Sequence, residues 1–252
     1  MSIAQDDLDT ARDERRDYDR MSWPPPTTIF SQPNGGGNLR THAANSLLEF
    51  PVPETRLLRG DGTDLVRPDQ AVEKLGIKPD EVTDVILSHV HWDHADGTDL
   101  FPKAQIWVQK DEYTYYTGEA WQPGGKHGGV YGQDVNVLYN ANVAGNLHLV
   151  NGDAEILPGI SVYIGGKHTW QSQYVSVTTR SGTVVLASDN MYLYENLEKH
   201  VPIAQTFDAA SNLRAQDRMK TIVSKPELIV PGHDPAVMTR FPKVADGVVR
   251  ID

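Results

Sequence analysis

The chain has 252 residues, a formal net charge of −11 and no cysteine. A chain of this length can bury a sizeable core, so we expect one α/β enzyme domain over residues 23–252, preceded by a charged tail over residues 1–22. The acidic balance excludes a surface that binds nucleic-acid phosphates, and the lack of cysteine excludes disulfides and thiolate metal ligands.

The tail contains no apolar stretch long enough for a signal peptide or a membrane span. We therefore expect a cytoplasmic protein with no membrane partner and no nucleic-acid partner. The proline run Trp23-Pro24-Pro25-Pro26 indicates a stiff boundary before the domain. The sequence leaves the oligomeric state open, with a homodimer as one option.

Strand and helix patterns alternate along the rest of the chain. A short helix is expected over residues 69–76, with Asp69 as its N-cap and Gly76 as its C-cap. Apolar runs predict strands over residues 82–88, 105–108, 160–164, 174–178, 183–188 and 228–230. Further helices are expected over residues 111–116 and 211–223.

Two segments fit this alternation poorly. The apolar stretches within residues 46–63 are short, which indicates an abbreviated first sheet. Residues 118–146 are rich in glycine and longer than a plain connection needs to be, so they are candidates for a lid.

The most informative stretch follows the apolar run 85–87. It places four potential metal ligands within six residues, namely His89, His91, Asp93 and His94. Side chains alternate faces in an extended segment, so the first two project to the same side, and a turn can bring the last two to a neighbouring point. Imidazole and carboxylate are ligands that zinc accepts, and this spacing suits two metal ions side by side.

Three further candidate ligands stand at the exits of other predicted strands. His168 follows strand 160–164 and a glycine turn, Asp189 directly follows strand 183–188, and His233 follows strand 228–230 and a Pro-Gly pair. Because these strands each end in a potential ligand, we expect the side chains to meet at one edge of the protein. Seven ligands are too many for one tetrahedral ion, which predicts about two.

These motifs, in this order, resemble the metallo-β-lactamase superfamily of hydrolases. The resemblance covers about residues 65 to 252 and rests on four elements: the run 89–94, the segment 166–173, Ser188-Asp189 and Pro231-Gly232-His233. It implies an αββα sandwich of two mixed β-sheets flanked by helices.

The resemblance also implies how the ligands are divided. One zinc ion would be held by His89, His91 and His168, a second by Asp93, His94 and His233, and Asp189 would bridge both. Histidine and carboxylate ligands also accept other divalent transition metals.

Within the superfamily the sequence is most similar to the N-acyl-homoserine lactonase group, which carries a tyrosine three residues after the bridging aspartate. Tyr192 stands at that position. The similarity implies a quorum-quenching type of hydrolase that uses a metal-bridging hydroxide to open a lactone or cleave a carboxylic ester. Tyr192 would stabilise the developing oxyanion or leaving oxygen, and Asp93 would carry a proton to the leaving oxygen.

Several alternatives remain open from the sequence. Tyr192 could instead pack beneath the site, and Tyr194 could be the functional tyrosine. The aromatic residues Trp92 and Trp170 favour a small-molecule substrate, a lactone or ester with an apolar part, but are equally compatible with core packing. Other candidate functions are a thioester hydrolase of the glyoxalase II kind, with lysines that receive a carboxylate, and a metal-binding protein without catalysis. The candidate lysines are Lys126 and Lys167.

Overall fold

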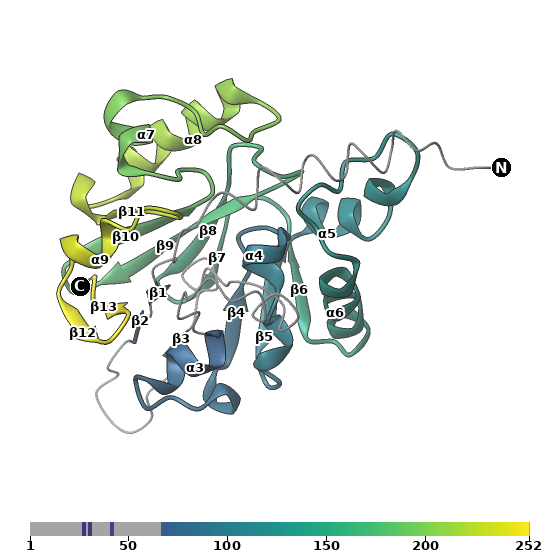
Figure 1. The fold of residues 1–252 in the computed structure, drawn as a ribbon, viewed down its shortest axis with the longest axis horizontal. Helices are drawn as coiled ribbons and strands as arrows, with labels where there is room; N and C mark the ends of the chain where they lie inside the picture. The colour runs from purple at the N-terminus through teal and green to yellow at the C-terminus, as the bar shows by residue number, and fades with distance from the viewer. Residues whose placement is uncertain (1–26, 29, 32–40, 43–66, 252) are drawn as a thin grey trace, which may run out of the picture.

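The fold of the chain is described by a computed structural model over residues 27–28, 30–31, 41–42 and 67–251. The expected tail over residues 1–22 and the expected opening strands within residues 46–63 lie outside the described residues. Figure 1 shows the strands at the centre, with α7 and α8 on one side and α5 and α6 on another. Among the helices of the described segments, none is long and apolar enough to cross a membrane.

The larger sheet has the strand order β11-β10-β9-β8-β7. Its strands are β7 (Ala154–Leu157), β8 (Ile160–Ile164), β9 (Gln173–Thr179), β10 (Gly182–Ser188) and β11 (Ile229–Pro231). Neighbouring strands from β7 to β10 are antiparallel, whereas β10 and β11 are parallel. The strands expected over residues 174–178 and 183–188 are confirmed as β9 and β10, and they pair as a hairpin with Val177 opposite Val184.

The second sheet is parallel and has the order β4-β5-β6. Its strands are β4 (Asp84–Ile86), β5 (Gln105–Gln109) and β6 (Leu147–Val150). Smaller pairings join β1 (Thr27–Thr28) with β13 (Val248–Val249) and β12 (Lys243–Ala245), and β2 (Phe30–Ser31) with β3 (Thr41–His42). The sequence did not predict β6 or β7, because each is four residues long and partly exposed.

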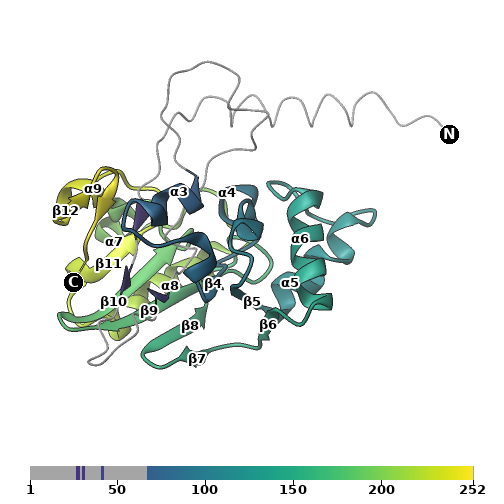
Figure 2. The ribbon, with the colours of Figure 1, turned by 90° about the horizontal axis from the view of Figure 1, so that it is seen from below.

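The helices surround these sheets (Figure 2). They are α3 (Pro68–Glu73), α4 (Trp92–Ala95), α5 (Lys110–Tyr116), α6 (Gly132–Val143), α7 (Tyr194–Lys199), α8 (Ala209–Ile222) and α9 (Val237–Arg240). Short 3-10 helices are η2 (Pro79–Glu81), η3 (Thr98–Leu100), η4 (Glu119–Trp121) and η5 (Pro226–Leu228).

Three predictions about the helices were wrong in detail. Arg67 and Lys74, not Asp69 and Gly76, are the N-cap and C-cap of α3. The Asp69 carboxylate in the first turn pairs with the Arg67 guanidinium at 2.7 Å. The helix expected over residues 111–116 begins one residue earlier, at Lys110, with Gln109 as its N-cap. The sequence also missed α6 within segment 118–146, because its fully buried side chains are only Asp134 and Leu138, which is too few for a clear apolar period.

The alternation of β10 shows how the layers form. Val184 and Leu186 belong to a buried cluster with Ile86 of β4, which lies between the two sheets. Val185 and Ala187 belong to another cluster with Met219 of α8. Successive side chains of a strand point to opposite faces, so one strand supplies both the contact between the sheets and the contact with the outer helix.

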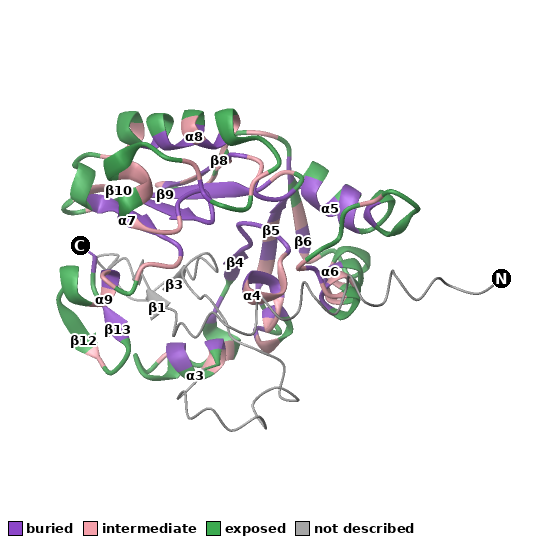
Figure 3. Cartoon of the chain, turned by 45° about the horizontal axis from the view of Figure 1, so that its top comes forward, coloured by how far each residue is buried: buried purple, intermediate pink, exposed green. Residues whose placement is uncertain are grey.

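A third cluster covers the outer face of the smaller sheet. Val85 of β4 and Leu87, which directly follows β4, pack there with Tyr113 and Tyr116 of α5 and Leu138 of α6. Strands β9 and β10 are largely buried, as is the face of α8 toward them (Figure 3). The order is therefore helix, sheet, sheet, helix, which confirms the expected αββα sandwich.

We expect Leu186→Ala to weaken the contact between the sheets. The Leu186 side chain is 1% exposed, so its truncation removes buried methyl groups and leaves a cavity. The free energy of unfolding from a denaturant titration should fall by about 2–5 kcal/mol. Val143→Ala is the control, because this side chain is 70% exposed. It should change the same quantity by less than about 0.5 kcal/mol, and equal effects of the two variants would contradict this packing.

Candidate metal centre

The ligand candidates of the first motif stand on a turn between β4 and α4. His89 and His91 lie in the non-helical segment that follows β4, and His91 is the N-cap of α4 with an extended backbone (φ −62°, ψ 151°). The single turn of α4 then carries Asp93 and His94. The structure therefore has His89 and His91 on an extended segment and Asp93 and His94 on the following turn, as the sequence predicts.

The other three candidates come from loops at the ends of three strands in the larger sheet. His168 follows β8 and two glycines, and a Cβ on Gly166 would lie 2.4 Å from the Asn212 Cα, so only glycine fits this approach to α8. Asp189 directly follows β10, where Ser188 takes a left-handed conformation with φ +47°. The His233 backbone N–H donates to Tyr192 O at 2.9 Å, so the loop after β11 is tied to the loop after β10.

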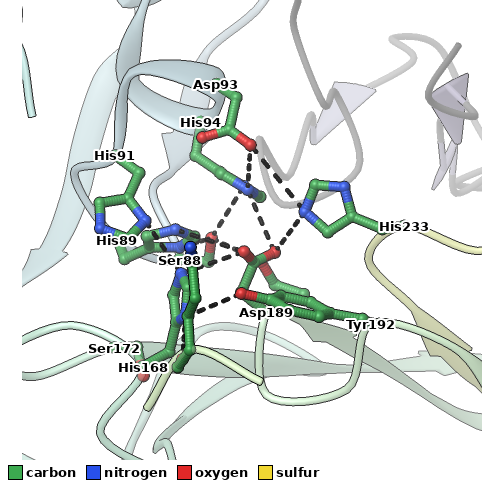
Figure 4. Close-up of polar contacts among 12 residues, drawn as sticks. Ser88, His89, His91, Asp93, His94, His168, Ser172, Asp189, Tyr192 and His233 are labelled. Atoms are coloured by element: carbon green, nitrogen blue, oxygen red, sulfur yellow. Dashed lines mark hydrogen bonds and ion pairs between the residues drawn. The ribbon is translucent and has the colours of Figure 1, made fainter. Parts of the chain in front are cut away.

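These loops bring all seven candidate side chains into two neighbouring groups (Figure 4). The first group is His89, His91, His168 and Asp189, and the second is Asp93, His94 and His233. Within each group the potential ligand atoms lie within 4.8 Å of one another. The same six side chains form the two expected sets, with Asp189 in the first group, and their division between two ions stays a prediction.

Asp189 lies between the two groups and presents one oxygen to each. Its Oδ2 is 3.1 Å from His168 Nε2 and 3.8 Å from His89 Nε2. Its Oδ1 is 3.1 Å from His94 Nε2 and 3.0 Å from His233 Nε2. A carboxylate placed in this way can bridge two metal ions.

Several atoms of the site have the surroundings that a metal ion requires. Two nitrogens bound to one tetrahedral zinc lie about 3.3 Å apart, given Zn–N distances of about 2.0–2.1 Å. His91 Nδ1 and His168 Nε2 are 2.9 Å apart. His89 Nε2 is buried and has no hydrogen-bond partner among the described residues. The residues therefore fit a dinuclear metal site.

The opposite nitrogens of two of these rings have protein partners. His168 Nδ1 lies 2.8 Å from Gln205 O, and His89 Nδ1 lies 3.0 Å from Ser88 Oγ. An imidazole that donates from Nδ1 keeps its Nε2 lone pair for a metal. Ser188 Oγ donates to Ser88 Oγ at 2.8 Å, so two buried serines link the ends of β4 and β10. The sequence analysis missed this pair, whose only signal is that each serine directly precedes a ligand candidate.

The histidines differ in protonation because their neighbours differ. Burial holds the pKa of His89 well below its usual value and lowers the pKa of His91 to about 3, so both rings are neutral. Burial also acts to lower the pKa of His94, but the carboxylates of Asp189 and Asp93 outweigh it. The pKa of His94 is therefore held well above its usual value.

The two carboxylates remain ionised. Burial acts to raise the pKa of Asp189, but His233 and the other histidines outweigh it and hold this pKa well below its usual value. For Asp93, burial again acts to raise the pKa, and His94 outweighs it, so that the pKa is about 2. Ionised carboxylates are the form that divalent metal ions bind, and a metal ion would displace the proton held by His94.

Only one of the two candidate tyrosines faces the ligands. The Tyr192 hydroxyl is 3.3 Å from His168 Nδ1, and its ring meets the His233 ring edge to face with centroids 5.2 Å apart. Tyr194 lies with its ring beneath the Arg240 guanidinium, 3.6 Å from its centroid. Burial raises the pKa of Tyr194 to about 12, and its hydroxyl has no hydrogen-bond partner within the described part of the chain.

Segment 118–146 contacts the first ligand motif directly. A Cβ on Gly129 (φ +76°) would lie 2.9 Å from the His91 ring, and the Trp92 backbone N–H donates to Gly129 O at 2.8 Å. The Trp92 ring stacks on Tyr131 with centroids 6.1 Å apart. A lid at this position remains a prediction, but the close approach explains why glycine is needed beside the site.

Comparison with known proteins agrees with this geometry. The Metallo-beta-lactamase superfamily profile matches residues 57–233, and the chain belongs to this superfamily. One similar relative is an N-acyl homoserine lactonase from Bacillus sp, 34% identical over 165 residues. This match covers 65% of the chain and 60% of the relative, so the chain spans about 60% of the length of the curated relatives that it matches.

Solved structures show the same likeness. An N-acyl homoserine lactone hydrolase with the product N-hexanoyl-L-homoserine bound at its catalytic metal center is 28% identical, with a TM-score of 0.55, and the match covers 68% of this chain and 63% of that one. A B. thuringiensis AiiA mutant with N-decanoyl-L-homoserine bound at the active site is 26% identical, with a TM-score of 0.61. The second match covers 80% of this chain and 81% of that one.

We expect Asp189→Ala to lower the metal content from about two ions per chain to one or none, because the carboxylate that faces both ligand groups is lost. Elemental analysis by mass spectrometry after dialysis measures this content. Asp217→Ala is the control, since this carboxylate is 55% exposed and, among the described residues, pairs with the surface groups His200 and Lys220. Full metal content in the Asp189 variant would rule out the bridging position.

Proposed function

We propose that this chain is a dinuclear zinc hydrolase that opens the ring of an N-acyl homoserine lactone or a similar lactone with an apolar acyl part. The observation that carries the proposal is the position of the Tyr192 hydroxyl beside His168, at the edge of two ligand groups that share Asp189. The lactonases among the similar proteins support the substrate class.

The two ligand groups divide the metal ions as follows in this proposal. His89, His91 and His168 hold one ion, Asp93, His94 and His233 hold the other, and Asp189 bridges them. When bound, the ions supply water of lowered pKa as a nucleophile and polarise the carbonyl of the lactone. Imidazole and carboxylate ligands in two four-coordinate groups favour zinc among the divalent metals.

Tyr192 is suited to donate a hydrogen bond in the transition state. The shorter contact of His168 Nδ1, to Gln205 O, takes the Nδ1 hydrogen when Nε2 binds a metal. Nδ1 is then a donor and does not accept the Tyr192 proton. In this proposal the phenol donates to the carbonyl or leaving oxygen of the substrate. Such a donor contributes most where negative charge develops.

Asp93 is suited to move the proton to the leaving oxygen. Its carboxylate is ionised, with a pKa of about 2, and its side chain is 25% exposed, whereas that of Asp189 is 4% exposed. Among the two carboxylates of the site, Asp93 is therefore the one that a substrate can approach. A carboxylate in this position accepts a proton from the nucleophile and returns it to the alkoxide.

The surroundings of two lysines favour the lactone over a glutathione thioester. Lys126 Nζ lies over the Phe207 ring, 4.8 Å from its centroid. Lys167 Nζ donates to Trp170 O at 2.7 Å and to Gln171 Oε1 at 3.1 Å. Both cations already have protein partners, which weakens their case as receptors for a substrate carboxylate.

A substrate panel tests the proposed activity. We expect the protein with about two zinc ions to hydrolyse N-acyl homoserine lactones with a higher kcat/KM than aryl esters or glutathione thioesters, because the similar proteins are lactonases and the two candidate lysines already have protein partners. A pH-indicator assay measures each rate. Chelation should abolish lactone hydrolysis and added zinc should restore it. Faster turnover of the thioester would favour the glyoxalase II alternative.

We expect Tyr192→Phe to lower kcat on a lactone by about 10²-fold, with a smaller change in KM, because the lost hydroxyl acts on charge that develops in the transition state. Metal content should stay unchanged. Tyr194→Phe is the matched control, because this hydroxyl has no hydrogen-bond partner in the described segments, and its kcat should stay within about threefold of the parent. Parent-like turnover in the Tyr192 variant would remove the phenol from the mechanism.

A further inference from the structure

Glu112 is a buried carboxylate that neither ligand group contains. It stands on α5, and its exposure is 0%. Its Oε1 accepts the Val90 backbone N–H at 3.1 Å, and its Oε2 accepts the Gln171 backbone N–H at 2.6 Å. One side chain thus receives one backbone hydrogen bond on each carboxylate oxygen.

The two donors belong to the loops that carry the histidines of the first group. Val90 lies between His89 and His91 in the loop after β4, and Gln171 lies three residues after His168 in the loop between β8 and β9. These loops come from different sheets, and Glu112 is hydrogen-bonded to both. The distance between the loops is therefore set in part by the width of one carboxylate.

A hydrophobic side chain at the position of Glu112 could be buried at a lower cost in free energy than a carboxylate. Glu112 is flanked on α5 by Tyr113 and Tyr116, which are buried in the outer apolar cluster. Burial raises the pKa of Glu112, while the Gln171 and Val90 backbone N–H groups act to lower it. Because a buried carboxylate seldom stabilises a fold more than well-packed apolar atoms do, its position points to the loops that it connects.

We propose that Glu112 is a positioning residue for the first ligand group. It holds the two loops at the separation at which His89, His91 and His168 share one metal ion. Among the described residues, its hydrogen bonds reach no member of the group formed by Asp93, His94 and His233. The inference rests on the proposed dinuclear site. It requires that a substitution of Glu112 lowers the affinity for one of the two metal ions more than the affinity for the other.

The variant Glu112→Gln tests this requirement. Glutamine has nearly the same shape, but only its carbonyl oxygen accepts a hydrogen bond, and its NH₂ group would face the second backbone N–H. One of the two loops is then released. We expect the affinity for one metal ion to fall by about 10–100-fold while the other ion stays bound with the affinity of the parent protein.

Titration of the metal-loaded protein with a chelator, followed by elemental analysis, measures the two affinities separately. The visible spectrum of the cobalt-substituted protein gives a second readout, because it reports the ligand geometry and not the overall stability. The variant should lose the absorption of one cobalt ion and keep that of the other.

Two further variants separate positioning from folding. Asp134→Asn changes another buried carboxylate, 4% exposed, which stands on α6 and makes no hydrogen bond to the ligand loops in the described segments. It should keep both ions even if the protein becomes less stable. Glu112→Asp retains two acceptor oxygens on a shorter side chain, so it should bind the weakened ion better than the Gln variant, and it serves as the test if the Gln variant does not fold.

The outcomes distinguish this inference from the proposed function. Unchanged affinity for both ions in the Glu112 variants would overturn the positioning role. Equal loss of both ions together with loss of the near-ultraviolet circular dichroism signal would also overturn it, since this indicates a role in folding alone. If the parent protein binds two ions but does not open lactones, the proposed substrate fails while the positioning role stands. If the parent binds no metal, both proposals fail.

Discussion

The position of the Asp189 carboxylate is the constraint on which the rest of the site depends. It is buried, it is ionised, and each of its oxygens faces a different group of histidines. A buried charge is stable only when opposite charge compensates it, and here His233 and His94 compensate Asp189, whereas His89 and His91 are neutral. Two bound metal ions would take over this compensation, so metal binding and the ordering of the ligand loops are expected to depend on each other.

Buried amide side chains hold the two sheets in the relation that this arrangement needs. The Gln173 backbone N–H donates to Ser88 O at 2.8 Å, and its side-chain amide donates to Leu87 O at 2.7 Å. Gln109, at the end of β5, donates to Gln173 Oε1 at 2.9 Å. These hydrogen bonds link the start of β9 to the end of β4. Losing one of them inside the protein lowers the free energy of unfolding by about 1–3 kcal/mol. His168 and Asp189 stand on neighbouring loops of the same edge, which explains why the site is built where the sheets meet.

Strong local patterns made much of the fold predictable. The β9-β10 hairpin follows from two apolar runs around Arg180-Ser181-Gly182, and β8 has the expected bounds, Ile160–Ile164. Weak or non-local signals failed. The helix α6 buries few side chains, so its apolar pattern is weak. The N-caps of α3 and α5 are Arg67 and Gln109, whose side chains form no cap hydrogen bond, so these residue types did not indicate where the helices begin. The superfamily was recognisable from the ligand motifs because their spacing depends on short stretches of chain.

The sequence by itself determined the chemical types of the candidate ligands and their places at strand exits, because strand alternation and local turns follow from neighbouring residues. Only the tertiary structure decided which groups meet across the chain. It places Tyr192 beside His168 and Tyr194 beneath Arg240, although both tyrosines follow Asp189 closely. It also brings Glu112 to the loops of Val90 and Gln171, and Ser188 to Ser88. These contacts join residues that are far apart in sequence, so they depend on how the two sheets pack and no local pattern encodes them.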